Sequence, residues 1–435
     1  MIYIHGGAFH GGSGNEDKQN PEFLLGEDVI VVQINYRLSF LGFFSTADRS
    51  APGNYGLKDS LEALRWVQSN IEAFGGDKDK VTVFGESAGG MIINYLKLSP
   101  LSKGLFHRAI TESGSIMGSA LSFQSYPRTY AFQIAKEMNI TFENSEDLVR
   151  QLMEIEDARI FVKYSPEWIR DFQIPMGKTG LVFAPSVEPE DSDEPRVLPD
   201  TPLNLYLKGD FLDIPHIIML MSEEHLMSAR QLEEFPELFE HIEQNQEVLL
   251  PLTWNIRPNT LEADEYLRTI NALYFNNEPI KNIYDYLHFA SDSLWNFGSY
   301  KAARLQVTRQ KSPVYFAVFS FSGDLSYFKI SGGLKDFIGA GHADDLPYIF
   351  TTEYFPKVTE DNPSYKVRAR TVKIWTNFAK YGDPTPVLDE LVNVKWEPMR
   401  DGFFSFMNMS TEMHLERDPF GDRMKVWYEM DRRFN

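Results

Sequence analysis

The stretch VTVFGESAGGMII, residues 81–93, joins a run of β-branched residues to a run typical of a helix through Gly85-Glu86-Ser87-Ala88-Gly89. This is the G-x-S-x-G pattern, in which a sharp strand-to-helix turn lifts a serine hydroxyl above the end of a sheet. Small residues are needed around the serine because the turn strains its backbone and brings neighbouring chain close. The pattern is short, but its place between a predicted strand and a predicted helix favours Ser87 as a nucleophile over a small-residue packing turn.

Strand and helix signals alternate on both sides of this turn. The run VIVVQINY, residues 29–36, predicts a fully buried strand, and 107–115, 214–221 and 313–321 are further strand candidates. A helix is predicted over 54–76, with Leu57, Leu61, Leu64 and Ile71 on one face and a glycine pair at its end. Strands separated by helices favour a single α/β domain, residues 1–435, with a mostly parallel central sheet and helices on both faces. The acidic, proline-rich segment 184–202 is expected to be an exposed loop.

Composition narrows the class of partner. The 435 residues include 62 acidic and 42 basic side chains, a formal net charge of -20. This charge repels phosphate backbones and anionic lipid surfaces, so we expect a small-molecule substrate and neither nucleic acid nor a membrane span. There is no cysteine, hence no disulfide and no thiolate nucleophile. Without a recognisable signal peptide an intracellular location, cytoplasmic or microsome-associated, is expected, although the sequons at Asn139 and Asn408 weakly favour secretion.

A serine nucleophile needs a base for its proton and hydrogen-bond donors for the oxyanion that forms. The opening stretch MIYIHGGAFHGG supplies candidate donors, because a strand that ends in HGGA exposes consecutive backbone N–H groups at Gly6, Gly7 and Ala8. The N–H of Ala88, at the head of the predicted helix, adds another. Alone, the stretch would indicate only a glycine turn at a strand end; together with Ser87 it favours an oxyanion hole.

The base and the acid are sought beyond the serine, because the Ser, acid, His order is the one that this fold uses. Five histidines lie at or after the expected acid: His225, His241, His288, His342 and His414. His342 is the best candidate base, since glycines before it and an Asp pair after it indicate a polar loop at a strand end; a solvated loop histidine is the alternative. Glu224 lies just past the predicted strand 214–221, where functional residues of such sheets gather. Glu223 beside it is a competitor that spacing alone does not exclude.

The chain resembles the type B carboxylesterases, the cholinesterase and carboxylesterase family of α/β hydrolases, and among them the insect alpha-esterases. The resemblance is carried by IHGGAF, APGNYGLKDSLEALRWVQSNIEAFGGDKDKVTVFGESAGG, FHRAITESGS, GAGHADDLPYIF and WTNFAKYGDPTP, which run from residue 1 almost to the C-terminus. It implies a serine esterase that hydrolyses carboxylic esters through an acyl-enzyme and uses no metal or organic cofactor. Small to medium uncharged esters, including xenobiotics or lipid-derived esters, are the implied substrates.

The resemblance also assigns roles to individual residues. It implies Ser87 as the nucleophile, His342 as the general base and Glu224 as the acid that orients the imidazole. It further implies a set of supporting groups: the oxyanion-hole amides of Gly7, Ala8 and Ala88, the hydroxyl of Ser113 beside the acid, and a structural salt bridge between Arg37 and Asp59.

Three features depart from the family pattern. Ala8 stands where a third glycine is frequent, which keeps the N–H donor but narrows the acyl side of the hole. His225 replaces the glycine after the acid, and if that glycine needs positive φ, the loop is strained and Glu224 tilts. The family's N-terminal segment is missing, so residues 29–36 are expected at an open sheet edge. A second interpretation therefore stays open, a catalytically impaired cholinesterase-like binding protein or a non-functional truncated isoform, and the sequence indicates no oligomeric state.

Overall fold

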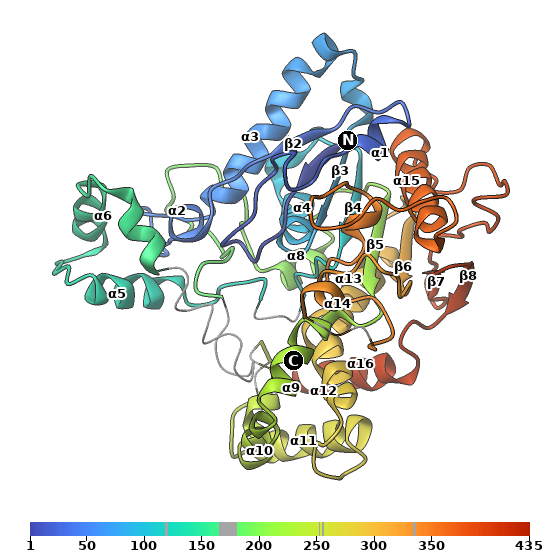
Figure 1. Ribbon diagram of the computed structural model, residues 1–435. Helices are drawn as coiled ribbons and strands as arrows, with labels where there is room; N and C mark the ends of the chain where they lie inside the picture. The colour runs from blue at the N-terminus through green and yellow to red at the C-terminus, as the bar shows by residue number, and fades with distance from the viewer. Residues whose placement is uncertain (118–120, 165–180, 252, 255, 333, 335) are drawn as a thin grey trace.

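The computed structural model describes residues 1–117, 121–164, 181–251, 253–254, 256–332, 334 and 336–435. Its centre is an eight-stranded sheet of order β2-β1-β3-β4-β5-β6-β7-β8 (Figure 1). Neighbouring strands pair in parallel, except for the antiparallel pair β7 and β8. The strands are β1 (Ile2–Ile4), β2 (Val32–Ile34), β3 (Thr82–Glu86), β4 (Arg108–Glu112), β5 (His216–Met221), β6 (Val314–Phe319), β7 (Ser405–Met409) and β8 (Met413–Arg417).

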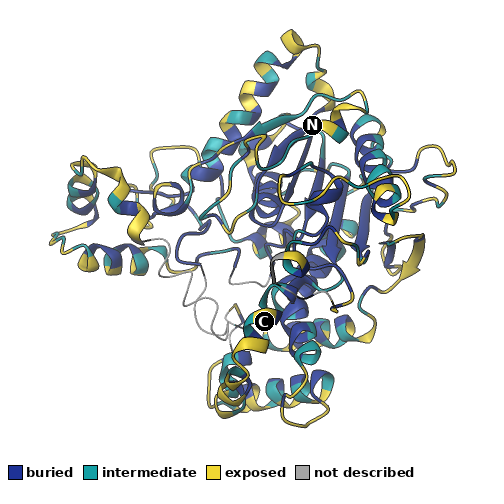
Figure 2. Ribbon diagram, viewed as in Figure 1, coloured by how far each residue is buried: buried dark blue, intermediate teal, exposed yellow. Residues whose placement is uncertain are grey.

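Helices cover both faces of the sheet, because successive strand residues point to opposite sides. Ile2 and Ile4 pack in one apolar cluster with residues of α3 and α4, while Tyr3 packs in a second cluster with residues of α15. Figure 2 shows the buried sheet between these helices, with exposed residues on their outer sides. The helices are α1 (Glu22–Leu25), α2 (Ser39–Phe43), α3 (Tyr55–Asn70), α4 (Ala88–Leu98), α5 (Pro127–Glu137), α6 (Ser145–Met153), α8 (Pro202–Lys208), α9 (Ala229–Glu234), α10 (Glu237–Gln244), α11 (Leu261–Tyr274), α12 (Ile283–Ser291), α13 (Phe297–Val307), α14 (Tyr327–Gly332), α15 (Pro363–Tyr381) and α16 (Asp422–Phe434).

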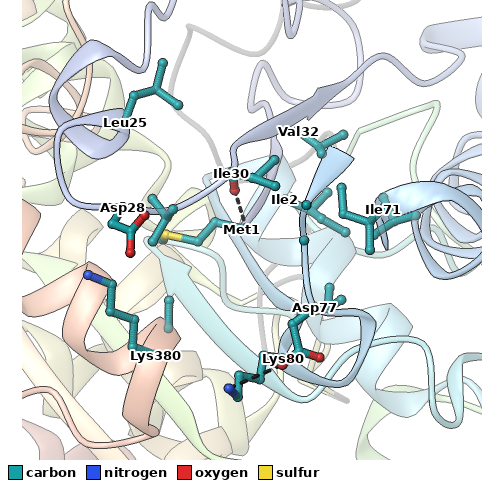
Figure 3. A pocket seen from close by; sticks show the side chains of 16 residues that line it. Met1, Ile2, Leu25, Asp28, Ile30, Val32, Ile71, Asp77, Lys80 and Lys380 are labelled. Carbon is teal, nitrogen blue, oxygen red and sulfur yellow. Dashed lines mark hydrogen bonds and ion pairs between the residues drawn. The ribbon is translucent and has the colours of Figure 1, made fainter. Parts of the chain in front are cut away.

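The first strand lies inside the sheet, between β2 and β3, and β2 forms the edge, as the sequence predicts. The predicted strand 29–36 is shorter in the structure, Val32–Ile34, because its partner β1 has only three residues in register with it. A pocket lies at the amino ends of these strands, lined in part by Met1, Ile2, Val32 and Ile71 (Figure 3). Since Ser87 follows the carboxyl end of β3, this pocket belongs to the opposite edge of the sheet.

Two parts of the chain differ from the sequence-based expectation. The strands β7 and β8 were not among the predicted strands, because their residues carry no long β-branched run. The segment 184–202 is irregular, as expected, but it is not exposed throughout: Glu188, Val197 and Leu198 are buried. Burial of the Glu188 carboxylate is stabilised by hydrogen bonds from Asn54 Nδ2 (2.9 Å) and the Val197 amide (3.1 Å).

Candidate active site

Ser87 stands at the turn between β3 and α4. Its backbone is strained, with φ 54° and ψ -124°, and its amide donates to the carbonyl of Glu112 on β4 (2.8 Å). The small residues of the pattern are required by contact with β1: a Cβ on Gly89 would lie 1.9 Å from the carbonyl oxygen of Ile4. Positive φ at Ser87 and the glycine beside β1 together make this the turn that the sequence predicts.

The loop after β1 packs directly against this turn. A Cβ on Gly6 would lie 3.1 Å from Cβ of Ser87, so only a glycine lets the two segments approach so closely. Gly7 and Ala8 both have positive φ, 112° and 52°. In the part of the chain that the structure describes, the amides of Gly7, Ala8 and Ala88 donate to no protein acceptor. Ala88 also opens α4, where the helix dipole favours negative charge.

Glu224 and His342 meet at the carboxyl ends of the strands. Glu224 begins the 3-10 helix Glu224–Ser228 just after β5, and His342 lies on a loop beyond β6. His342 Nδ1 lies 2.8 Å from Glu224 Oε2. The other oxygen, Oε1, accepts hydrogen bonds from Ser113 Oγ (2.6 Å) and from the Met221 amide (2.9 Å). Three contacts therefore fix the buried carboxylate in place.

The competitor Glu223 faces away from this pair. Its Oε2 lies 3.4 Å from Nε2 of His288, a histidine of α12. The contact with Glu223 raises the pKa of His288, against the effect of burial. Of the two neighbouring glutamates, the structure thus brings only Glu224 to His342.

The second nitrogen of His342 contacts a carboxylate and not the serine. His342 Nε2 lies 3.0 Å from Oε1 of Glu86, the residue before Ser87, and Ser87 Oγ makes no hydrogen bond with the imidazole. Burial alone would lower the pKa of His342, but Glu86 and Glu224 together raise it to about 10. Its place between two carboxylates therefore favours the protonated imidazole at neutral pH.

More buried acids lie behind this contact. Glu112, at the end of β4, accepts a hydrogen bond from Trp375 Nε1 (2.6 Å), and burial together with the charge of Glu86 raises its pKa to about 8. Asp345 is fully buried, and burial, Glu112 and Glu86 raise its pKa well above the ordinary value. Close carboxyl groups resist ionising together, so burial and mutual repulsion favour the protonated forms of Glu112 and Asp345 while Glu86 pairs with His342.

His225, which replaces a family glycine, causes no backbone strain here. Its φ is not among the positive values, so the position does not need a glycine. Its amide donates to Ser291 Oγ (2.9 Å), and Nε2 lies 2.9 Å from Ser228 Oγ. Burial, and to a smaller extent the charge of His342, lowers the pKa of His225 to about 3, so this imidazole is neutral. The tilt of Glu224 considered from the sequence does not occur.

The remaining assignments concern support and cofactors. Arg37 and Asp59 form a two-pronged ion pair, with Nε to Oδ2 and Nη2 to Oδ1 both 2.8 Å. Among the described residues, no group of three or more His, Cys, Asp or Glu side chains is arranged to hold a metal ion. None of the described helices is both long and apolar enough to cross a membrane.

Two residues of the site were not assigned a role from the sequence, Glu86 and Trp295. Glu86 lies inside the G-x-S-x-G pattern, but the pattern constrains only its neighbours and leaves its side chain unspecified. Trp295 packs on His342, with ring centroids 4.2 Å apart, although it is far from any motif. No sequence signal indicated it.

A mostly parallel sheet with a strained serine between β3 and α4 is the architecture of an α/β hydrolase. The chain belongs to the carboxylesterase family, whose model matches residues 1–427. It is 31% identical over 402 residues to the juvenile hormone esterase of Tribolium castaneum, covering 89% of this chain and 67% of that protein. It is 32% identical over 430 residues to esterase FE4 of Myzus persicae, covering 96% and 72%.

A solved structure shows the same fold. The juvenile hormone esterase of Manduca sexta, crystallised with OTFP covalently attached, matches with a TM-score of 0.85 and 29% identity over 99% of this chain and 80% of that one. Membership of the family, insect esterases as relatives and this structural match identify the chain as a carboxylic ester hydrolase.

Proposed function

We propose that Ser87, His342 and Glu224 form the catalytic triad of this esterase, with the amides of Gly7, Ala8 and Ala88 as the oxyanion hole and Ser113 as the support of the acid. The observation that carries the proposal is the 2.8 Å contact between Glu224 and Nδ1 of His342, beside the strained turn at Ser87. An imidazole held through Nδ1 presents Nε2 as its reactive nitrogen.

In the first half of the reaction, Ser87 Oγ bonds to the ester carbonyl carbon while His342 Nε2 takes its proton. The carbonyl oxygen becomes an oxyanion, which accepts hydrogen bonds from the amides of Gly7, Ala8 and Ala88. Each of these donors lowers the activation free energy by about 3 kcal/mol. Collapse of this intermediate breaks the bond to the alcohol, which leaves with the proton from His342. An acyl group remains on Ser87.

In the second half, water takes the place of the alcohol. His342 removes a proton from it, the hydroxide oxygen bonds to the acyl carbon, and the carboxylic acid leaves as Ser87 recovers its proton. Glu224 holds Nδ1 of the ring and stabilises the imidazolium that forms in each half. Its three contacts support this role, because an acid fixed by Ser113 and Met221 fixes the ring as well.

Glu86 has to leave Nε2 before His342 can act as a base. In the ligand-free protein that nitrogen is paired with Glu86 Oε1 at 3.0 Å, and a paired imidazolium accepts no proton from Ser87. The Glu86 side chain already lies close to the loop after β1: a Cβ added to Gly6 would be 2.5 Å from Glu86 Oε2. If Glu86 rotates toward this loop, the loop has to adjust. We therefore place two events ahead of the attack by Ser87. The Nε2 proton passes from His342 to Glu86 Oε1, 3.0 Å away, which leaves a neutral imidazole and a neutral carboxylic acid, and the Glu86 side chain then turns away from Nε2.

The charge of the site bears on the substrate class. Glu86 and Glu224 both contact His342 beside the serine, and the buried carboxyl groups of Glu112 and Asp345 lie behind them, so the site offers an anionic ester no unpaired positive charge. Small to medium uncharged esters, including xenobiotic or lipid-derived ones, therefore fit the site best. Two of the relatives named above are juvenile hormone esterases, so juvenile hormone is one ester to test as a substrate. We further propose that residues 1–435 act as one domain, since the three triad residues follow different strands of one sheet: Ser87 follows β3, Glu224 follows β5 and His342 follows β6.

The test is reaction with a fluorophosphonate probe, followed by ester hydrolysis measured with the same preparation. Wild-type protein and Ser102→Ala should be labelled, because Ser102 is a buried serine whose hydroxyl has no partner among the described residues. Ser87→Ala should lose both labelling and hydrolysis. Folded wild-type protein that takes up no probe would contradict the triad and favour the alternative, a cholinesterase-like protein that only binds.

A further inference from the structure

A π-helical turn interrupts the helical layer beside the triad. The helices α12 and α13 are joined without a loop by Asp292–Asn296, which has π-helical hydrogen bonding. Such turns insert an extra residue into a helix, and they occur frequently at functional sites. The inserted turn carries Trp295, which is buried and packs on the imidazole of His342, with a ring-centroid distance of 4.2 Å and a tilt of 38°.

Buried polar contacts hold this turn in place. Asp292 accepts hydrogen bonds from Tyr274 (2.6 Å) and Asn296 (2.7 Å), and it pairs with Arg423 of α16 (2.8 Å). The hydroxyl of Tyr274 in turn accepts from Trp427 Nε1 at 2.6 Å. Helices α11 and α16 thus fix the π-helical turn, and a fixed turn gives Trp295 a fixed place over His342.

The polar atom of Trp295 takes no part in this arrangement. Its indole N–H meets no acceptor in the described part of the chain. An unpaired buried donor costs free energy, so the indole is retained for its flat apolar surface and not for hydrogen bonding. The surface that Trp295 offers beside the triad is therefore aromatic and apolar.

The place of the Trp295 ring beside His342 determines which part of a substrate it would contact. In ester cleavage His342 Nε2 gives its proton to the alcohol oxygen, which lies within about 3 Å of that nitrogen at that step. Atoms attached to the alcohol oxygen must then lie next to whatever covers the imidazole. The oxyanion amides lie on the loop after β1 and at the head of α4, away from the π-helical turn, so the carbonyl oxygen is directed elsewhere.

We propose that Trp295 forms the wall of the site for the alcohol part of the ester and that this wall favours esters of flat, apolar alcohols, such as aryl esters. The inference rests on the proposed function, since it requires Ser87 and His342 to cleave esters. Contact between the indole and an aromatic alcohol is worth about a threefold to tenfold preference at typical aromatic stacking strength.

The experiment compares phenyl acetate with ethyl acetate, following acid release for both. The variants are Trp295→Phe, which keeps a flat ring, and Trp295→Leu and Trp295→Met, which remove it; the methionine variant serves if the leucine variant does not fold. Trp396→Leu is the matched control, because Trp396 is also fully buried with an unpaired indole N–H but packs on Tyr315, away from His342.

Loss of the flat ring should lower kcat/KM for phenyl acetate by about threefold to tenfold more than for ethyl acetate, while Trp295→Phe and Trp396→Leu keep the wild-type ratio. Hydrolysis of the acetyl-enzyme, which contains no alcohol, should keep its rate in all variants. An equal loss on both esters with slower hydrolysis of the acetyl-enzyme would overturn the inference, since Trp295 would then only hold His342. The inference would also be overturned if Trp295→Leu or Trp295→Met folds, still takes up fluorophosphonate and keeps the wild-type ratio of kcat/KM for phenyl acetate to kcat/KM for ethyl acetate. Failure of the wild-type protein to take up the probe would instead contradict the triad.

Discussion

Glu86 Oε1 lies 3.0 Å from Nε2 of His342, at the nitrogen that a serine esterase needs for its nucleophile. Because Glu224 holds Nδ1 of the same ring, the imidazole lies between two carboxylates, and its pKa rises to about 10. Activity at neutral pH then depends on how readily the proton and the Glu86 side chain leave together. Under the proposed mechanism, Glu86 therefore sets the pH at which His342 becomes a base.

Replacing Glu86 by glutamine should move the acid limb of the pH profile to lower pH. Glutamine has nearly the same size but no charge, so it removes one of the two effects that raise the pKa of His342. Loss of an opposite charge at this distance lowers a pKa by about 1 to 3. The measurement is kcat/KM for a neutral ester between pH 5 and pH 10. Glu223→Gln is the control, because Glu223 contacts His288 instead; a limb that stays in place in Glu86→Gln would refute the role of Glu86.

Removing the Ser113 hydroxyl should weaken the hold on Glu224. Ser113 Oγ donates to Glu224 Oε1 at 2.6 Å, and a hydrogen bond to a charged group contributes about 1.5 to 3 kcal/mol. If about 1.4 kcal/mol or more of this hydrogen-bond free energy is lost in the transition state, kcat/KM of Ser113→Ala falls roughly tenfold or more. Fluorophosphonate labelling of Ser87 should slow in parallel. Ser102→Ala removes a buried hydroxyl without a described partner and should keep wild-type rates.

Adding a methyl group at Gly89 should prevent normal packing of the turn at Ser87. The new Cβ would lie 1.9 Å from the carbonyl oxygen of Ile4, and neither α4 nor β1 can move without disturbing the sheet. We expect Gly89→Ala to lower the free energy of unfolding by more than about 3 kcal/mol. Gly11→Ala, where a Cβ meets nothing within 4 Å, should change it by less than about 0.5 kcal/mol. Urea unfolding measures both, and equal midpoints would contradict the close approach.

The sequence predicted the parts of this protein that depend on local pattern. The turn at Ser87 and the strands that lead to Ser87 and Glu224 follow from hydrophobic runs and glycine placement, whereas the edge position of β2 was expected from the family resemblance. The contact partners of His342 do not, because they come from segments more than a hundred residues apart, such as Glu224 and Glu86, and depend on side-chain rotation. Spacing left Glu223 and Glu224 equivalent; the family resemblance favoured Glu224, and the path of the chain after β5 brings Glu224 and not Glu223 to His342.

Trp295 illustrates a second limit. A π-helical turn changes which helix face a residue occupies, and none of the residue types in Asp292–Asn296 predicts such a turn. The buried polar network around Asp292 is equally hidden, since Arg423 and Tyr274 come from other helices. Strain at His225 was expected only if the position needed positive φ, and that condition is not met: the residue lies in the 3-10 helix Glu224–Ser228 and has no positive φ, which a comparison of residue types does not reveal.

Lys97, near the end of α4, gives the last prediction. Its ammonium is fully buried and contacts Gln306, Gln310 and His216, and among the described residues it forms no ion pair with a carboxylate. Burial lowers its pKa to about 7, against a smaller raising effect of the charge of Asp213. Between pH 7 and its ordinary value of 10.5 the unfolded chain binds this proton and the native protein does not, so Lys97 makes stability rise with pH. His342 acts in the opposite direction: its native pKa of about 10 exceeds the ordinary 6.5, so its stabilisation is full below pH 6.5 and is lost as pH rises through 10.

The two groups therefore oppose each other over the same pH range, and removing Lys97 should expose the effect of His342. Lys97→Met keeps an apolar chain of similar length, and Gln306 retains its contact with His216 at 2.8 Å. We expect the free energy of unfolding of Lys97→Met to fall more steeply from pH 7 to pH 10 than that of the wild-type protein. The measurement is urea unfolding at several pH values, with Lys103→Met, at an exposed lysine, as the control. A slope equal to that of the wild-type protein would mean that Lys97 stays protonated in the fold across this range, and the opposition between the two groups would not exist.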